Sequence, residues 1–324
     1  MFPEITRCIG GKFMFYSVLK ECEDANSREL DISPVFHIDI IVPLFVQNFS
    51  KVFETLETIV IVYSNFSKIE TLHPCKLLKN IYCSMTRITR LSPGIEHFTN
   101  LEILNCEYNG LSNLEGIENL KNLKELSCHS NREIENLKEI ENLENLILLD
   151  CSECSIKNVK FLERLVKLKI LYISENPVES LEGIENTKRL EKFECSRTNI
   201  NSFFPLRNHG GSLKSLSIED NINMKNFLHL GRMISLEMIC FGFIERGILS
   251  YKGFPPAPKK ESSRTLNIYH GEWSLIQDRQ TIEFIHESSG TSKFHTLFSC
   301  LRNRSSFIFW LWDENSINKL YEFF

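Results

Sequence analysis

The residues best suited to chemistry in this sequence are its cysteines, of which there are 11 in 324 residues. Thiolates can act as nucleophiles, form disulfides or bind zinc. One C-x-x-C pair, Cys151 and Cys154, could begin a zinc site, but no second pair follows at a usable spacing. The separations between the C-terminal candidates also match no zinc pattern; these are His270, His286, His295 and Cys300. We therefore predict no metal site and no cofactor.

Signatures of other catalytic sites are missing from the sequence. It contains no G-x-x-x-x-G-K-S/T phosphate loop, no G-x-G-x-x-G, no G-x-S-x-G and no H-E-x-x-H. We predict that the protein is not an enzyme, and the last 60 residues are the part in which a catalytic site could still lie. A net charge of −5 gives no overall basic excess for binding nucleic acid.

The elements that hold the cysteines follow an internal repeat. Stretches beginning at Leu101, Leu123, Leu146 and Leu168 share the pattern L-x-x-L-x-C/I-x-x-N/C-x-L/I and return to leucine after 22 or 23 residues. The spacing extends forward through Leu190, Leu213 and Leu236, and backward to Leu78 and Leu56. Alternating apolar residues at positions 4 and 6 predict a short strand, and stacked units would bury them as one column. Apolar residues every third position then predict tight 3₁₀ or extended segments.

When the cysteines are numbered by their position in the repeat, most of them are predicted to be packing residues. Position 6 holds Ile or Phe in some repeats and cysteine in five others: Cys83, Cys106, Cys128, Cys151 and Cys195. A position that accepts Cys, Ile or Phe is an apolar one, because free cysteine behaves as a small buried hydrophobe. Zinc ligands and a ladder disulfide are the alternatives. Five further cysteines have no place on the grid: Cys8, Cys22, Cys75, Cys240 and Cys300.

The repeat resembles the leucine-rich repeat family over about residues 55 to 244. Tails such as NGLSNLEGIENLKNL look most like the short 22-residue class in the regulatory subunit of protein phosphatase 1, and bacterial internalins share the repeat length. The resemblance implies an α/β solenoid with parallel strands on a concave face and 3₁₀ or extended segments on a convex face. It also implies that an inward residue at position 9 hydrogen-bonds the backbone, where Asn109, Asn131, Asn176 and Asn221 stand, with Cys154, Thr86 and Thr198 as substitutes.

The variable strand positions of a solenoid form its recognition surface. Position 3 contributes an apolar row, and acidic residues lie around it. Between Leu101 and Leu190 there are 17 acidic and 11 basic residues, which favours a partner with basic and aromatic groups. The alternative is that Glu-rich tails such as EGIEN only maintain solubility. The predicted partner-binding residues are Tyr82, Ile103, Asn105, Glu107, Glu125, His129, Leu148, Asp150, Ile170, Tyr172, Lys192 and Glu194.

The chain ends depart from the repeat. We predict an N-terminal cap over residues 1–54, a solenoid of eight to nine repeats over 55–244, and a linker with an aromatic-rich C-terminal cap or small module over 245–324. The last part contains GFPPAPKKESS and all three tryptophans, Trp273, Trp310 and Trp312. The longest N-terminal apolar stretch, Phe13 to Leu19, is too short for a secretory signal, so we expect a cytoplasmic, monomeric protein that contacts no membrane.

Two functions are consistent with this organisation. The first is a non-catalytic scaffold that binds a protein partner on the concave face. The second is a substrate-recruiting adaptor, either ubiquitin-ligase-like or phosphatase-regulatory, whose terminal segment recruits a second protein. Repeat class alone is weak support for any particular partner.

Overall fold

The computed structural model describes residues 2–33, 38–221, 233 and 235–241, together with four short strands further along the chain. These strands are β11 (Asn267–His270), β12 (Ile282–Glu283), β13 (Ile285–His286) and β14 (Phe294–His295). The rest of the predicted C-terminal segment, with its tryptophans and Cys300, lies outside the described residues. The choice between a C-terminal cap and a small module therefore stays open.

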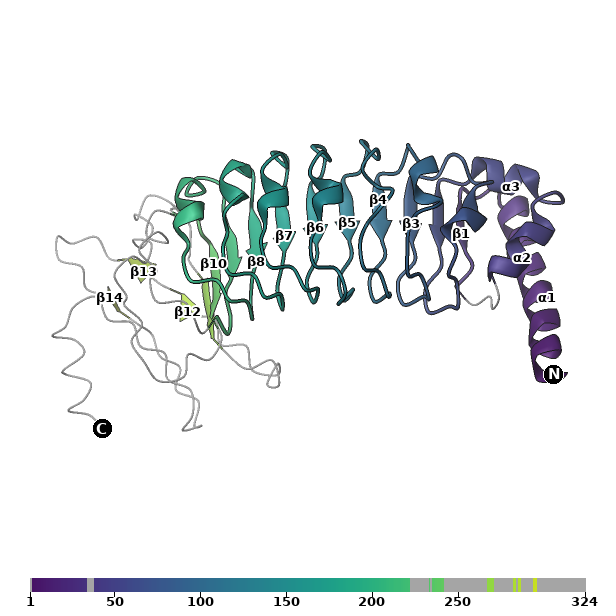
Figure 1. Cartoon of the computed structure of the whole chain (residues 1–324), viewed down its shortest axis with the longest axis horizontal. Coiled ribbons are helices and arrows are strands. Elements are labelled where there is room, and N and C mark those ends of the chain that lie inside the picture. Colours follow the sequence, from purple (N-terminus) through teal and green to yellow (C-terminus); the bar gives the residue numbers. More distant parts are fainter. Residues whose placement is uncertain are drawn as a thin grey trace.

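Twelve of the described strands form one sheet whose order is the order of the sequence, β1 to β12. From β1 to β11 each strand pairs in parallel with the next, and β12 is antiparallel to β11. Figure 1 shows them side by side along the long axis. Their bounds are β1 Glu29–Asp31, β2 Thr58–Val60, β3 Asn80–Tyr82, β4 Ile103–Asn105, β5 Glu125–Ser127, β6 Leu148–Asp150, β7 Ile170–Tyr172, β8 Lys192–Glu194, β9 Ser215–Ser217 and β10 Met238–Phe241.

Strand pairing places equivalent repeat positions opposite one another. Ile103 pairs with Glu125, and Glu125 pairs with Leu148. Each of these residues is two places after the leading leucine of its repeat. The predicted phase of the repeat is confirmed, and with it the α/β solenoid. A shift of one residue would exchange the buried and exposed faces of a strand, so this register decides which side chains meet solvent.

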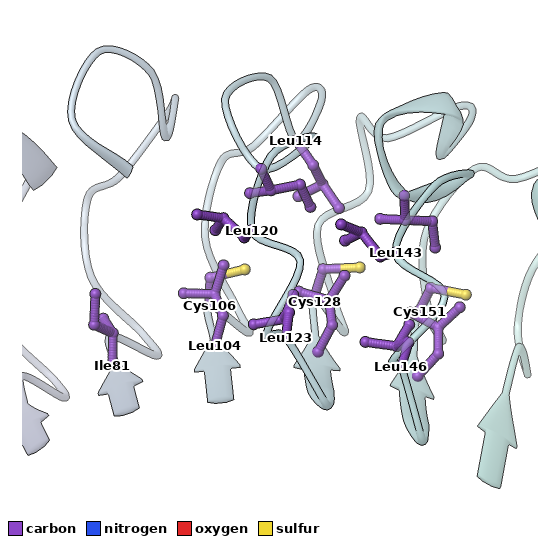
Figure 2. Packing of buried hydrophobic residues seen from close by; sticks show 14 of the residues in the cluster. Ile81, Leu104, Cys106, Leu114, Leu120, Leu123, Cys128, Leu143, Leu146 and Cys151 are labelled. Atoms are coloured by element: carbon purple, nitrogen blue, oxygen red, sulfur yellow. The ribbon is translucent and has the colours of Figure 1, made fainter. Parts of the chain in front are cut away.

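The core lies between the strands and the opposite side of each repeat. The leading leucines, the middle strand residues and the position 6 residues all point into this space, and Figure 2 shows Leu104, Cys106 and Leu120 there. Tight turns close each repeat on the convex side and contribute an apolar residue about every third position. Six of them form 3₁₀ helices: Ile69–Leu72, Ile95–His97, Lys138–Ile140, Lys160–Leu162, Ile184–Asn186 and Phe204–Asn208.

Some glutamates of the repeat tails have a structural role. In the sequence G-I-E, the glycine adopts a positive φ, for example +110° at Gly183, and its N–H donates to the glutamate carboxylate at 2.8 Å. A Cβ at Gly183 would lie 2.7 Å from Cα of Lys160 in the preceding repeat, so only glycine fits there. The same bond, at 2.9 Å, forms from Gly94 to Glu96 and from Gly116 to Glu118. These tails therefore do more than maintain solubility.

Position 9 holds the strand exits together. Asn131 is fully buried; its Nδ2 donates to the carbonyls of Cys128 and Cys106 at 2.8 and 3.0 Å, and its Oδ1 accepts from the Leu111 amide at 3.0 Å. Two repeats later, Asn176 makes the same three bonds with Ile156, Cys151 and Ile173. The Thr198 hydroxyl donates to the Cys195 carbonyl at 3.0 Å. The role that the resemblance implied for position 9 is confirmed.

Helices occupy the N-terminal end: α1 (Phe2–Asp24), α2 (Ile38–Phe45) and α3 (Ser50–Thr55). They lie at one end of the row of strands in Figure 1, and Phe15 of α1 packs edge-to-face on Phe45 of α2, with ring centroids 5.4 Å apart. Between α1 and α2, β1 adds a strand to the sheet by pairing with β2. The sheet thus begins inside the segment that the sequence assigns to a cap, and the domain limits 1–54, 55–244 and 245–324 stay a prediction.

Candidate functional site

The exposed face of the sheet is built from equivalent positions in successive repeats. Each short strand buries its middle side chain, so its first and third side chains lie on the opposite face. We call this the concave face, and we call the first strand residues row one, the third row two, and the residues two places further along row three. The predicted partner-binding residues all lie on it: Ile103, Glu125, Leu148, Ile170 and Lys192 in row one, Tyr82, Asn105, Asp150, Tyr172 and Glu194 in row two, and Glu107 and His129 in row three.

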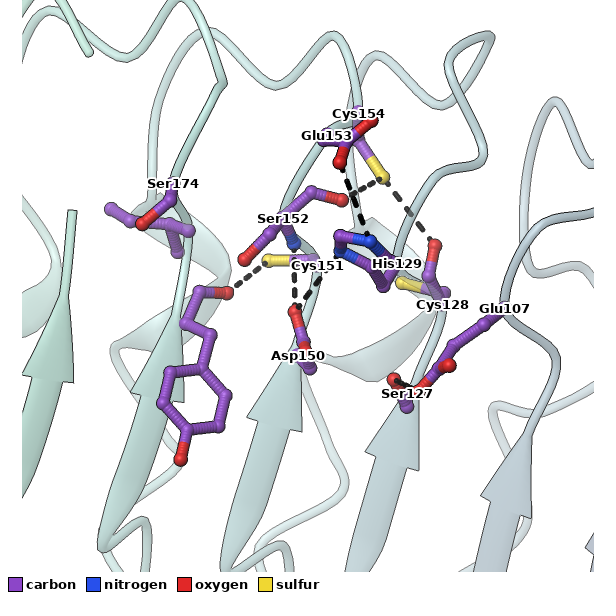
Figure 3. Close-up of polar contacts among 12 residues, drawn as sticks. Glu107, Ser127, Cys128, His129, Asp150, Cys151, Ser152, Glu153, Cys154 and Ser174 are labelled. Atoms are coloured by element: carbon purple, nitrogen blue, oxygen red, sulfur yellow. Dashed lines mark hydrogen bonds and ion pairs between the residues drawn. The ribbon is translucent and has the colours of Figure 1, made fainter. Parts of the chain in front are cut away.

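Ser127 lies at the centre of an acidic part of the concave face. Glu125 precedes it on β5, and Asp150 is its registered partner on β6. The Ser127 hydroxyl donates to Oε1 of Glu107 at 2.6 Å (Figure 3). Nδ2 of Asn105 donates to the same oxygen at 2.9 Å. We call Glu107, Glu125 and Asp150 the Ser127 carboxylates. Three acidic side chains thus surround one small residue.

The side chain of Asp150 is largely buried, with 23% of it exposed. Burial raises the pKa of Asp150, and the nearby charge of Glu107 adds to the effect. The backbone N–H of Ser152 donates to Oδ1 of Asp150 at 3.0 Å and acts in the opposite direction. The charge of His129 also favours the ionised form of Asp150. A further positive group brought close to Asp150 would stabilise its ionised form in the same way.

His129 separates Asp150 from the nearest arginine. Its Nε2 lies 3.5 Å from Oε1 of Glu153, and its Nδ1 lies 4.0 Å from Oδ1 of Asp150 (Figure 3). The same Nε2 lies 3.0 Å from the Tyr108 hydroxyl. Arg132 pairs with Glu153 at 2.8 Å and lowers the pKa of that carboxyl. The charge of Arg132 is therefore directed at Glu153, and the basic side chain beside the Ser127 carboxylates is His129.

Apolar side chains lie next to this acidic area. Leu148 and Ile170 are registered partners, and Tyr172 shares β7 with Ile170. The sequence predicted an apolar row that also includes Ile103, but Glu125 stands between Ile103 and Leu148 in the register. The continuous apolar area is therefore Leu148, Ile170 and Tyr172. Beyond it, Nζ of Lys192 lies 4.9 Å from the Tyr172 ring centroid and 2.8 Å from Glu194. The positive charge of Lys192 therefore already has partners within the protein.

The cysteine ladder lies behind this face. Cys83, Cys106, Cys128, Cys151 and Cys195 are fully buried and unpaired, which confirms their assignment as packing residues. Several of the thiols also donate to a carbonyl of the next repeat, as Cys83 does to Asn105 at 3.3 Å. Burial raises the pKa of Cys83 to about 12. These thiols are therefore poor nucleophiles.

The structure places three of the cysteines that the sequence left unassigned. Cys22 is buried in the N-terminal helices and Cys75 in the core, and Cys240 lies in row two, opposite Ser217. The side chain of Cys8 lies outside the described residues. Within the part of the chain that the structure describes, no three His, Cys, Asp or Glu side chains are grouped so as to hold a metal ion.

Two further rows of side chains were missed by the sequence reasoning. The first, the trailing row, follows row three by one residue, and each member has a left-handed backbone with φ between about +50° and +57° although none is glycine. These residues all stand at position 8 of the repeat. The residue types at that position differ so much that the sequence does not reveal their shared backbone conformation. The members are Tyr63, Met85, Tyr108, Ser130, Glu153, Glu175, Arg197 and Asp220.

The second, the leading row, precedes each strand by one residue, and its charges alternate in sign. Lys124 pairs with Glu102 at 2.6 Å, and Glu191 pairs with both Lys169 and Lys214, at 3.1 and 2.6 Å. Alternation could have been read from the sequence by listing position 2 of successive repeats. The full row is Glu57, Lys79, Glu102, Lys124, Ile147, Lys169, Glu191, Lys214 and Glu237, and Arg28 pairs with Glu57 at its start.

Ile147 is the one member of the leading row that is not charged, and the alternation of sign calls for an acid there. It is 36% exposed. We expect Ile147→Glu to pair with Lys124 and Lys169 and to raise the free energy of unfolding by about 0.5 kcal/mol relative to Ile147→Gln. Urea unfolding at low salt and in 1 M NaCl measures this, because salt should abolish the difference. Equal stability of the two variants at low salt would contradict the pairing.

Taken together, the parallel one-strand repeats, the buried leucine columns and the position 9 ladder define a leucine-rich repeat solenoid. In agreement, residues 99–142 match the family of leucine rich repeats (2 copies). Among solved structures the chain is similar to an internalin C2 from Listeria monocytogenes, with a TM-score of 0.56 and 22% identity over 59% of this chain and 83% of that one. A second Listeria monocytogenes internalin, InlF, gives a TM-score of 0.46 and 18% identity over 60% and 70% of the two chains.

No curated protein matches this chain in sequence. The identity to internalin C2 is low enough that the likeness concerns the fold alone. As for membrane insertion, none of the helices in the described ranges is long and apolar enough to cross a bilayer.

Proposed function

We propose that the protein is a non-catalytic, monomeric interaction scaffold of the cytoplasm that binds a protein partner on the concave face of its repeats. The observation that carries this proposal is the difference in ion pairing between the concave face and the rows of charged residues beside it. The leading row forms ion pairs within itself, and in the trailing row Arg197 pairs with Glu175 and Asp220. The concave face instead combines the three Ser127 carboxylates with the half-buried apolar area of Leu148, Ile170 and Tyr172. A partner with basic and aromatic groups fits such a face.

The resemblance of the repeat tails to the regulatory subunit of protein phosphatase 1 supports a scaffold in general. Repeat class alone is weak support for a phosphatase partner, and no phosphatase-contacting residue is assigned to this chain. The adaptor function needs a terminal segment that recruits a second protein, and that segment falls outside the described residues. The concave face is therefore the part of the molecule to test first.

The test is the double variant Tyr172→Ala with Asp150→Lys. It removes the aromatic ring from the apolar area and reverses the charge of one of the Ser127 carboxylates. We therefore expect at least a tenfold loss of partner capture from a cell extract. A matched control, Tyr63→Ala with Glu144→Lys, makes the same changes at exposed positions off the concave face. Circular dichroism checks that both variants keep the fold. Equal capture by the two variants would place the partner elsewhere on the molecule.

A further inference from the structure

The charge of the concave face is uneven, and the unevenness can be traced to particular residues. Ser127 has eight neighbours in the three rows: one before it and one after it on its own repeat, and three on each adjacent repeat. They are Glu125, His129, Ile103, Asn105, Glu107, Leu148, Asp150 and Ser152. Three of the eight are acids and none is a lysine or arginine. In the described residues, Glu125 has no ion pair within 4 Å, whereas Glu194 on the same face has Lys192.

Other rows of this protein show that its repeats readily place a cation beside an acid. In the leading row each acid from Glu57 to Glu191 has a lysine partner one repeat away. The absence of such a partner around Ser127 is therefore a local property of the concave face. Asp150 is a partly buried carboxylate whose ion-pair partner, His129, lies 4.0 Å away, and burying this carboxylate costs free energy in the folded protein. A cation supplied by a partner offsets that cost.

We propose that the concave face between β4 and β7 docks an extended partner segment that presents an arginine to the Ser127 carboxylates and an apolar side chain to Leu148, Ile170 and Tyr172. This inference rests on the proposed function and adds the chemistry of the bound segment. Arginine suits the place better than lysine, because its planar guanidinium has five N–H donors and is less strongly hydrated. The small Ser127 side chain leaves room above it, with carboxylates on three sides.

The register also sets the spacing within the bound segment. Ser127 is on β5 and Tyr172 is on β7, two strands away, and neighbouring strands are about 4.8 Å apart. The arginine and the apolar side chain should therefore be roughly 10 Å apart. A segment in the polyproline II conformation that crosses the strands repeats its side-chain direction every three residues, with a rise of about 3.1 Å per residue, or roughly 9 Å. The segment should carry the two side chains three residues apart.

A selection from a library of random dodecapeptides, with the full-length protein immobilised, tests the inference directly. We expect enriched peptides to contain an arginine with an aliphatic or aromatic residue three positions away. The best peptide, labelled with fluorescein, is then titrated by fluorescence anisotropy. Replacing its arginine by citrulline, which has nearly the same shape but no charge, should weaken binding at least tenfold.

Variants of the protein separate this inference from the proposed function. Glu125→Gln with Asp150→Asn keeps the side-chain shapes and removes two charges, so it should weaken peptide binding at least tenfold. The control Glu144→Gln with Glu182→Gln, off the concave face, should leave peptide binding unchanged. Enriched peptides without arginine, or peptides that ignore Glu125→Gln with Asp150→Asn but lose binding with Ile170→Ala, would overturn the arginine site and leave the scaffold function standing. Failure to enrich any peptide, or peptides indifferent to every concave variant, would count against both.

Discussion

Replacing Asn131 by alanine should lower the free energy of unfolding by about 3 kcal/mol. The side chain is fully buried and makes three hydrogen bonds, one to a backbone group of its own repeat and two to backbone groups of the preceding repeat. The Cys106 carbonyl keeps a second donor, Nδ2 of Asn109 at 3.0 Å. The Leu111 amide has only the Asn131 oxygen, and leaving one such buried donor unsatisfied costs about 1–3 kcal/mol on its own.

A series of substitutions at Asn131 identifies the cause of the loss. Asn131→Thr keeps one donor, as Thr198 does at the same repeat position, so it should lose about half as much. Asn131→Asp has the right shape but cannot donate to the two carbonyls, so it should be the least stable at neutral pH. Asn122 also donates to a carbonyl one repeat away, but on the exposed surface, and Asn122→Ala should change stability by about 0.5 kcal/mol or less. Urea unfolding followed by circular dichroism gives the values, and an Asn131→Ala variant as stable as the wild type would show that position 9 does not hold the turns together.

The second large effect concerns thiol reactivity. In the native protein the ladder cysteines should react with iodoacetamide at least about 1,000-fold more slowly than in the chain unfolded by guanidinium. Two causes act together. The side chains have no contact with solvent, and a pKa of about 12 for Cys83 leaves almost no thiolate near pH 8.

Mass spectrometry of peptides after timed labelling resolves the individual cysteines. All five ladder cysteines should share this protection, because opening the core exposes them together. Cys240, in row two of the concave face, is half-buried and gives a comparison outside the ladder. Rapid labelling of Cys106 or Cys128 in the native protein would contradict their assignment as core residues.

The sequence was sufficient to predict the solenoid, its phase and the buried cysteines, for one physical reason. A parallel stack forces every repeat to present the same position to the same environment, so a pattern that recurs along the sequence recurs in space. Cys106, Cys151 and Cys195 could be assigned to the core without knowing any contact. The same reasoning placed Tyr172 and Asp150 on the exposed face.

What the sequence could not predict depends on contacts that break or ignore the pattern. The strand β1 was missed because Ser27 stands where later repeats have a leading leucine, and helices follow it where later repeats have a tight turn. The stacking of Lys192 on Tyr172 depends on rotamers, which spacing does not fix. The left-handed conformation at Tyr108 is imposed by the turn rather than by the residue type.

The alternating leading row has a consequence for how the length of this protein can change. Loss of a single internal repeat, such as the one that begins near Leu78, would remove Lys79 and bring Glu57 next to Glu102. Loss or duplication of two consecutive repeats would preserve the order of the charges. Recombination within the gene should therefore tolerate changes in repeat number by even steps better than by odd ones, so the row makes the parity of the repeat count a selectable property.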